Sequence, residues 1–265
     1  MGKRSRQQSG RRPERRQDAR LTSERIRALD GQPVPGDIYA TVVSPVELPD
    51  GRVLAFHGPQ VVAFNLFEAQ RHAERGVKAR LRLIGNLYRR EDDYGWWGIK
   101  DASKGLDCVR DLAVAVLFSY AALEGLGNHT IDQLDENTSV EVTRGGKTVQ
   151  ITRDEMERGL SVAEKLSVVI PAFTGNPSLK GDALWAKFVT LRRLRDALVH
   201  PKDRGSNPLR QDSPSPGPDP KDPGIYGLLM RGDADTCADD AIELVRTLRP
   251  EFLPPHVLTG LGLET

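Results

Sequence analysis

The chain has 265 residues, 38% of them hydrophobic and 28% charged, a balance typical of soluble globular proteins. No apolar run is long enough to cross a bilayer, and the amino-terminal residues lack the apolar stretch of a signal peptide. Cys108 and Cys237 suit neither a zinc knuckle nor a disulfide framework, so we expect two reduced, buried thiols. These features predict a cytoplasmic protein with no membrane partner.

Residues 1–30 are predicted to form a basic, disordered arm. Residues 1–20 hold eight basic and two acidic side chains, a net charge of +6, which leaves −5 for the rest of a chain whose total is +1. Such an arm either attracts a polyanion such as RNA or is a solvated tail with no specific partner. The candidate RNA-binding side chains are Arg4, Arg6, Arg11, Arg12, Arg15, Arg16 and, far along the chain, Lys202.

The first half of the body should contain one β-hairpin and two long helices. Residues 31–60 form a hairpin extension around the Pro-Asp-Gly turn, and a helix is expected from Val61 to Arg90 with Gly76 as a candidate break. The tryptophans of Gly95–Gly98 should pack between helices rather than stack on a base. Ser103 could cap the most periodic helix, which should run to about Leu134. Its apolar stripe comprises Val109, Leu112, Ala113, Val116, Leu117, Tyr120, Leu123 and Gly127.

The second half should add a hairpin insertion and three helices. The hairpin spans about 138–151, and a capping box at Thr152–Glu155 opens a helix that Pro171 should end. Helices of about 182–200 and 235–249 follow, separated by a flexible Pro- and Gly-rich loop at about 203–224. The expected fold is mostly α, a bundle of four to five helices over residues 61–250 with two small hairpin insertions and a tail at 251–265.

One arginine lies on the apolar face of the helix of about 182–200. In helical projection Arg195 falls about 20° from the centre of the stripe formed by the apolar residues Phe188, Leu191, Leu198 and Val199. Because an unpaired buried guanidinium is costly, Arg195 needs a carboxylate or a water-lined cleft. Glu124, with Asn128 one turn further, is the best partner that the pattern offers. Facing polar groups in a bundle core are either a structural network or a site.

His200 stands five positions after Arg195 and directly before Pro201. The residue before a proline is pushed out of α geometry, so the helix should unwind at His200 and let the imidazole turn toward the cleft. A permanent cation beside a titratable imidazole suits phosphodiester chemistry.

The sequence Arg195-Asp196-Ala197-Leu198-Val199-His200 resembles the signature of the HEPN superfamily, an arginine and a histidine separated by four to six residues. The wider segment from Trp185 to Lys202 and the segment Ser119–Ile131, with its acidic Glu124, are similar to bacterial helices of that family. Arg52 and His57 match the bare spacing too, but they lie in the hairpin and we interpret them as a chance match.

The resemblance implies a dimeric helical bundle in which the motifs of two protomers line one cleft. Active members of the family are metal-independent ribonucleases, many of them toxins or phage-defence effectors. The resemblance therefore adds a cognate antitoxin or regulatory protein as a candidate partner. In that scheme His200 is the general acid or base and Arg195 stabilises the transition-state charge. Asp196 orients either of them, and Glu124 and Asn128 are supporting residues that hold Arg195 in place. The product is a 2′,3′-cyclic phosphate.

The same residues also fit a module without catalysis. Asp196 is the less common residue after the arginine and offsets part of its charge, so a dimeric module that binds RNA, a nucleotide or a partner protein remains open. No phosphate-loop, zinc-protease or hydrolase motif is present, and no cofactor or metal is expected. The remaining histidines lack metal-ligand spacing and should be ordinary surface or packing residues: His57, His72, His129 and His256.

Overall fold

The computed structural model describes residues 43–57, 61–89, 97–200 and 224–253. The chain divides into two compact units, Met1–Gly58 and Pro59–Thr265, close to the predicted boundary between the hairpin extension and the helical body. In the first unit β1 (Val43–Glu47) pairs antiparallel with β2 (Val53–His57). Gly51 takes a φ of 80° in the turn between them, a conformation open to glycine, and Arg52 pairs with Asp50 at 2.6 Å.

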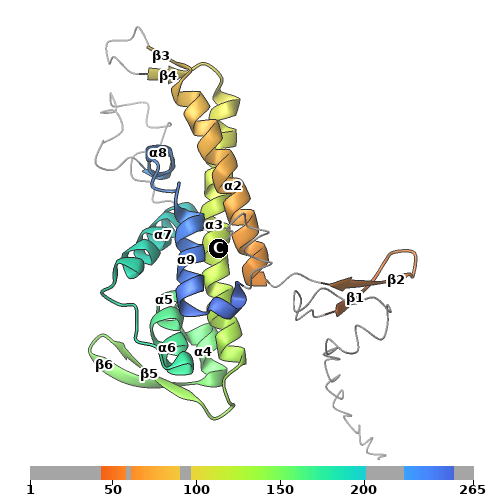
Figure 1. The fold of residues 1–265 in the computed structure, drawn as a ribbon, viewed down its shortest axis with the longest axis vertical. Coiled ribbons are helices and arrows are strands. Elements are labelled where there is room, and N and C mark those ends of the chain that lie inside the picture. The colour runs from red at the N-terminus through yellow and green to blue at the C-terminus, as the bar shows by residue number, and fades with distance from the viewer. Residues whose placement is uncertain (1–42, 58–60, 90–96, 201–223, 254–265) are drawn as a thin grey trace, which may run out of the picture. The chain divides into compact units, whose positions relative to one another are not determined.

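The second unit is built on two long antiparallel helices, α2 (Val61–Ile84) and α3 (Ala102–Asp132), connected through the short pair β3 (Leu87–Arg89) and β4 (Trp97–Ile99). Figure 1 shows the two helices side by side over most of their length. The expected break at Gly76 is wrong, because α2 runs through it. A Cβ at that position would lie 2.7 Å from Cγ of Leu112, so the glycine allows the helices to approach closely.

Helix α3 is the central element and contacts α2, α7, α9 and the helical turns of residues 162–174. Its N-cap is Asp101, not Ser103: the Asp101 carboxylate accepts hydrogen bonds from the Ser103 amide at 3.1 Å and hydroxyl at 2.6 Å. The predicted apolar stripe is buried or half-buried except for Leu117, which is exposed. Further residues are buried outside the predicted stripe, because α3 has neighbours on several sides: Cys108, Ala115, Ser119, Ala122 and Leu126.

A hairpin of β5 (Ser139–Arg144) and β6 (Lys147–Thr152) follows α3 where the sequence predicts an insertion. It packs Val140 and Val142 into a small second core. The predicted capping box is confirmed at the start of α4 (Arg153–Gly159), where the Thr152 amide donates to the Glu155 carboxylate at 3.0 Å.

The single helix expected from Thr152 to Ile170 is wrong in two respects. The chain breaks after α4 at Leu160 and restarts with α5 (Val162–Glu164), a π-helical turn (Lys165–Val169) and α6 (Ile170–Thr174). Pro171 lies inside α6 and does not end the helix. The wider π turn that precedes it relieves the clash that a proline ring makes with the preceding turn of an ideal α-helix.

Helices α7 (Ala183–Val199), α8 (Gly224–Arg231) and α9 (Cys237–Leu248) complete the body. The predicted apolar positions of α9 are all buried: Ala241, Leu244, Val245 and Leu248. Cys108 and Cys237 are confirmed as free, buried thiols, and burial raises both of their pKa values, that of Cys237 to about 12. The expected tail from residue 251 begins inside the fold. Phe252, at the end of the short turn Pro250–Phe252, and the following Leu253 are both buried.

The prediction of a mostly helical chain is confirmed. Among the described residues, no helix is both long enough and apolar enough to span a membrane.

Candidate functional site

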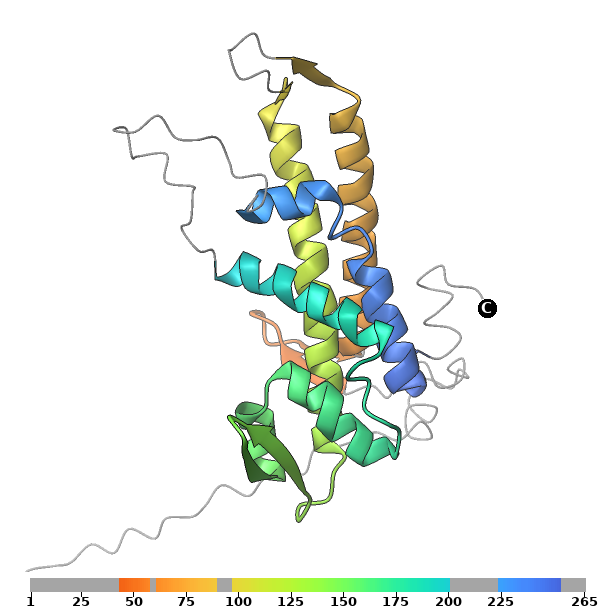
Figure 2. The same cartoon turned by 90° about the vertical axis from the view of Figure 1, so that its left-hand side faces the viewer.

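The candidate site lies at the carboxyl-terminal end of α7. Asp182 caps the start of this helix by accepting a hydrogen bond from the Leu184 amide at 3.1 Å. The helix ends as predicted at His200, whose φ of −123° and ψ of 64° are not helical. The His200 amide still donates to the carbonyl of Asp196 at 2.9 Å, while the residue as a whole is exposed. In Figure 2, α7 crosses α3 and its carboxyl-terminal end extends past it.

Arg195 lies on the side of α7 that faces α3, as the helical projection predicts. Its guanidinium carbon is 5.0 Å from the centroid of the Tyr120 ring, and Nη1 donates to Oδ1 of Asp196 at 3.0 Å. A flat cation over an aromatic face is a favourable contact that tolerates partial burial. The Arg195 side chain remains 30% exposed, so it is supported by the protein and still reaches solvent.

Tyr120 supports Arg195 from α3. Its ring stacks on Phe188 of α7 with centroids 6.4 Å apart, which fixes the crossing point of the two helices. Burial raises the pKa of the Tyr120 hydroxyl; Asp196 and Glu124 act in the same direction, and the nearby Arg195 and Arg192 act against it. The phenol therefore stays protonated and serves as a neutral platform beneath the arginine.

Glu124 does not pair with Arg195, contrary to the expectation. The carboxylate within hydrogen-bond distance of the guanidinium is that of Asp196, and Glu124 is exposed. The reason is the crossing of the helices, which places Arg195 over Tyr120, one turn before Glu124 on α3. Arg195 therefore pairs with its neighbour Asp196 on α7 and not with Glu124 across the crossing of α7 and α3.

Asn128 has a partner that the sequence reading missed. Lys165 in the π turn is buried, and its Nζ donates to Oδ1 of Asn128 at 2.6 Å and to the carbonyl of Glu157 at 2.8 Å. Burial lowers the pKa of Lys165, while Glu124 and Glu157 act in the opposite direction. The signal was present in the sequence, because Lys165 falls on the same helical face as the apolar residues Val162 and Val169.

Gly127 makes room for this lysine. A Cβ on Gly127 would lie 2.8 Å from Cβ of Lys165 and 3.1 Å from its Cδ, so the aliphatic part of the lysine packs directly against the α3 backbone. Tyr120, Glu124 and Asn128 are spaced four residues apart on α3, which puts them on one side of the helix. Arg195 and Asp196 therefore lie near Tyr120, at one end of these three residues, and Lys165 lies near Asn128, at the other.

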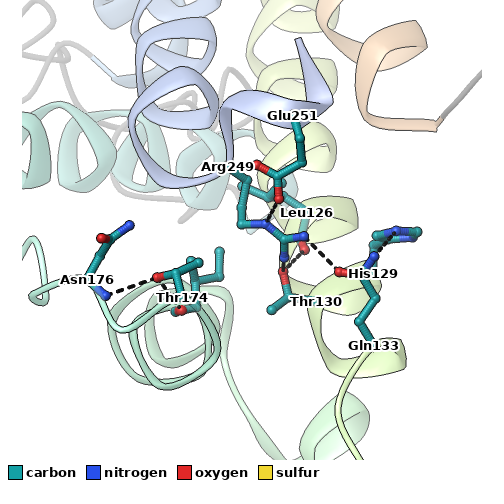
Figure 3. A network of polar contacts seen from close by, with 9 residues as sticks. Leu126, His129, Thr130, Gln133, Thr174, Asn176, Arg249 and Glu251 are labelled. Atoms are coloured by element: carbon teal, nitrogen blue, oxygen red, sulfur yellow. Dashed lines mark hydrogen bonds and ion pairs between the residues drawn. The ribbon is translucent and has the colours of Figure 1, made fainter. Parts of the chain in front are cut away.

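A second polar network surrounds Arg249, at the carboxyl-terminal ends of α3 and α9 (Figure 3). The Arg249 side chain is buried, with Nη1 donating to the Thr130 hydroxyl at 2.8 Å, Nη2 to Oε1 of Gln133 at 2.7 Å, and Nε to the Glu251 carboxylate. The rings of Phe173 and Phe252 contact the guanidinium at 4.6 and 5.1 Å. All three nitrogens are used by the protein, so this network is structural.

His72 is more than the ordinary histidine that the sequence suggests. Its Nδ1 lies 2.9 Å from Oδ1 of Asp111 on α3, and its Nε2 lies 3.8 Å from a carboxylate oxygen of Glu68 on its own helix. Both ring nitrogens face carboxylates, so the ring links α2 to α3 and offers no nitrogen to a substrate. His129, also expected to be ordinary, packs edge-on against Phe252 with centroids 4.9 Å apart.

Several predicted features lie outside the described residues. These are the arm of residues 1–30 with Arg4, Arg6, Arg11, Arg12, Arg15 and Arg16, then Lys202, His256, and residues 203–223 of the Pro- and Gly-rich loop. Of the Gly95–Gly98 loop only Trp97 and Gly98 are described, as part of β4. Within the described ranges, no three His, Cys, Asp or Glu side chains are placed to hold a metal ion together.

Comparison with known proteins adds no family to this geometry: no protein-family model, curated protein or solved structure matches the chain.

Proposed function

We propose that the protein is a metal-independent endoribonuclease of HEPN type that works as a homodimer, with Arg195 and His200 as its reactive pair. The observation that carries the proposal is the state of Arg195: the protein holds the guanidinium over Tyr120, yet its side chain stays 30% exposed. A purely structural arginine is expected to be enclosed and fully paired, as Arg249 is. His200 adds an exposed imidazole five positions on, at the cap of the same helix.

The reaction divides between these groups in a balanced way. His200 takes the proton of a ribose 2′-hydroxyl, the 2′-oxygen forms a bond to phosphorus, and the bond from phosphorus to the 5′-oxygen breaks. The leaving oxygen takes up a proton from the imidazolium of His200 or from water, giving a 2′,3′-cyclic phosphate and a 5′-hydroxyl. Arg195 binds the phosphate oxygens, whose negative charge grows in the transition state. Asp196, paired with Nη1 of Arg195, fixes the orientation of the guanidinium.

RNA cleavage in EDTA tests the proposal. Wild type, Arg195→Ala and His200→Ala are compared on a labelled panel of structured RNAs, with analysis of the product ends. We expect cyclic-phosphate ends from the wild type and a loss of at least about a hundredfold in each variant, the usual size for a lost general base or charge-stabilising donor.

A matched control is available on the same helix. Arg193→Ala removes an exposed arginine two residues before Arg195; Arg193 forms an ion pair with Asp233 at 3.6 Å. It should cut at close to the wild-type rate. Equal losses in Arg193→Ala and Arg195→Ala would mean that general positive charge is responsible, and a folded wild type that cuts no RNA would reject the enzyme.

A module that binds RNA, a nucleotide or a partner protein without cutting is the second candidate. It is favoured by the ion pair of Arg195 with Asp196, which offsets the charge that catalysis would need. RNA binding that depends on Arg195 while the strand stays intact would select this function. Asp196→Asn distinguishes the two, because it should strengthen RNA binding by a module but impair an enzyme that needs the carboxylate for orientation.

A further inference from the structure

The outward side of α3 carries an ordered row of three exposed side chains, Arg110, Leu117 and Glu124. They are seven residues apart, close to two helical turns, so they drift by only about 20° from one to the next. Arg110 is 63% exposed at its side chain and Leu117 40% exposed as a residue, and Glu124 is exposed as well. The half-buried Val114 and Ala121 lie between them. We call these five residues the α3 row.

Apolar groups from α2 extend the row on one side. Phe64 is exposed and meets Phe118 of α3 edge-on, with ring centroids 6.3 Å apart, and Val61 is exposed one turn earlier. On the other side of the row lies Tyr120 with Arg195 of α7 above its ring. An apolar surface with one cation at one end and one anion at the other is typical of an interface in which charge sets the register.

We propose that a second copy of this chain packs antiparallel on the α3 row about a two-fold axis at Leu117. The spacing points to this partner, because Arg110 and Glu124 lie the same seven residues, about 10 Å, on either side of Leu117. A two-fold axis there places each Arg110 opposite the Glu124 of the other copy, twice. A parallel pairing would set like charges against each other, at a cost in affinity.

The charges at the two ends are available for this pairing. Among the described residues, no hydrogen bond or ion pair joins Glu124 to another side chain, and the residue is exposed. Lys165 attracts its charge only at longer range. Arg110 contacts Asp107 through Nη1 at 3.1 Å and lies 4.0 Å from Asp111 through Nη2. Its guanidinium is 63% exposed and has five N–H donors, so it can still bind a further carboxylate. Leu117 meets its own copy on the axis, and the flanking apolar side chains are removed from water together.

The pairing also has a consequence for the site on α7. A two-fold axis that crosses α3 at right angles within the interface keeps the α7 edge of both copies on the same side. The two sets of Arg195, Asp196 and His200 then lie along one side of the assembly. This inference rests on the proposed homodimer and not on cleavage. Dimerisation is measured as molecular mass, and cleavage is measured separately on RNA.

A charge-swap series on the full chain tests the register. Arg110→Glu and Glu124→Arg should each weaken dimerisation by at least about tenfold in sedimentation equilibrium, because each sets like charges together. The double variant restores both pairs in reverse and should return to within about threefold of wild type. Lys147→Glu, on the exposed β6, is the matched control and should leave the dimer unchanged.

A crosslink tests the position of the axis. Leu117→Cys should form a disulfide-linked dimer on mild oxidation, because a residue on a two-fold axis meets itself, whereas Arg110→Cys alone should not. The native thiols do not interfere, since Cys108 and Cys237 are buried.

Three results would overturn the inference, each distinguishable from failure of the proposed enzyme. A dimer that tolerates both single reversals uses another face, and a double variant as weak as the singles refutes the register. A wild type that stays monomeric at its highest soluble concentration refutes the pairing altogether, even if it cuts RNA in an Arg195-dependent way.

Discussion

Two arginines of this protein lie against the helical core and are treated by it in different ways. Arg249 is buried, with all three of its nitrogens hydrogen-bonded and two phenylalanine rings against it. Arg195 has one carboxylate and one ring and is 30% exposed. The enclosed guanidinium of Arg249 contributes to stability, whereas that of Arg195 stays accessible to solvent.

The largest effect is expected at Arg249. Replacing it with alanine leaves the Thr130 hydroxyl and the Gln133 amide oxygen without a donor and opens a space between Phe173 and Phe252. We expect a loss of about 3–4 kcal/mol in the free energy of unfolding, measured by urea denaturation. Arg246→Ala, one turn earlier on the exposed side of α9, is the control and should change stability by less than about 0.5 kcal/mol. Similar losses in the two variants would remove the structural role of Arg249.

The sequence predicted the two arginines unequally well, for a physical reason. Arg195 was found because its helix is regular, so its position on the apolar face could be computed from the neighbouring leucines. Arg249 follows the end of α9, and Thr130, Gln133 and Phe173, which enclose it together with its near neighbours in the chain, come from α3, its C-cap and α6, more than seventy residues away. Periodicity places a residue on a face but says nothing about what a distant segment brings to it.

The misassigned partner of Arg195 has the same origin. Helical projection identified Glu124 and Asn128 as polar residues beside the core, yet the angle at which α7 crosses α3 decides which cation reaches which group. The close approaches at Gly76 and Gly127 and the π turn that carries Lys165 are also products of packing. The helices α3, α7 and α9, with their local apolar patterns, were within reach of the sequence, and so was the capping box that opens α4.

A third arginine, Arg144, is intermediate between Arg249 and Arg195 in how completely the protein pairs it. Arg144 at the end of β5 forms a two-pronged ion pair with Glu164, at 2.7 and 2.8 Å, near the protein surface. Hydrogen bonds from Arg144, assisted by those from Ser161 and opposed by burial, lower the pKa of the Glu164 carboxyl from 4.5 to about 2. Because the folded-state pKa is depressed, the stabilisation is present above pH 4.5 and is lost as the pH falls toward 2.

Loss of the Glu164 carboxylate should change how stability depends on pH. Glu164→Gln should lower the free energy of unfolding by about 1 kcal/mol at pH 7 and make it flatter between pH 5 and 3, as followed by urea denaturation at each pH. Glu141→Gln, at an exposed position of β5, the strand that carries Arg144, controls for the loss of one negative charge. If both variants keep the wild-type slope, the Arg144 pair does not persist in solution.

The smallest stability effect is expected at Arg195. Its alanine variant loses a ring contact and a partly exposed ion pair, so the free energy of unfolding should fall by no more than about 1 kcal/mol. The same substitution is expected to remove RNA cleavage, so stability and activity should separate at Arg195 while Arg249→Ala costs mainly stability. Parallel thermal melts and cleavage assays on the two variants check this. A loss at Arg195 as large as that at Arg249 would mean that its guanidinium is a structural group that happens to reach the surface, and the reason for treating it as a site would be gone.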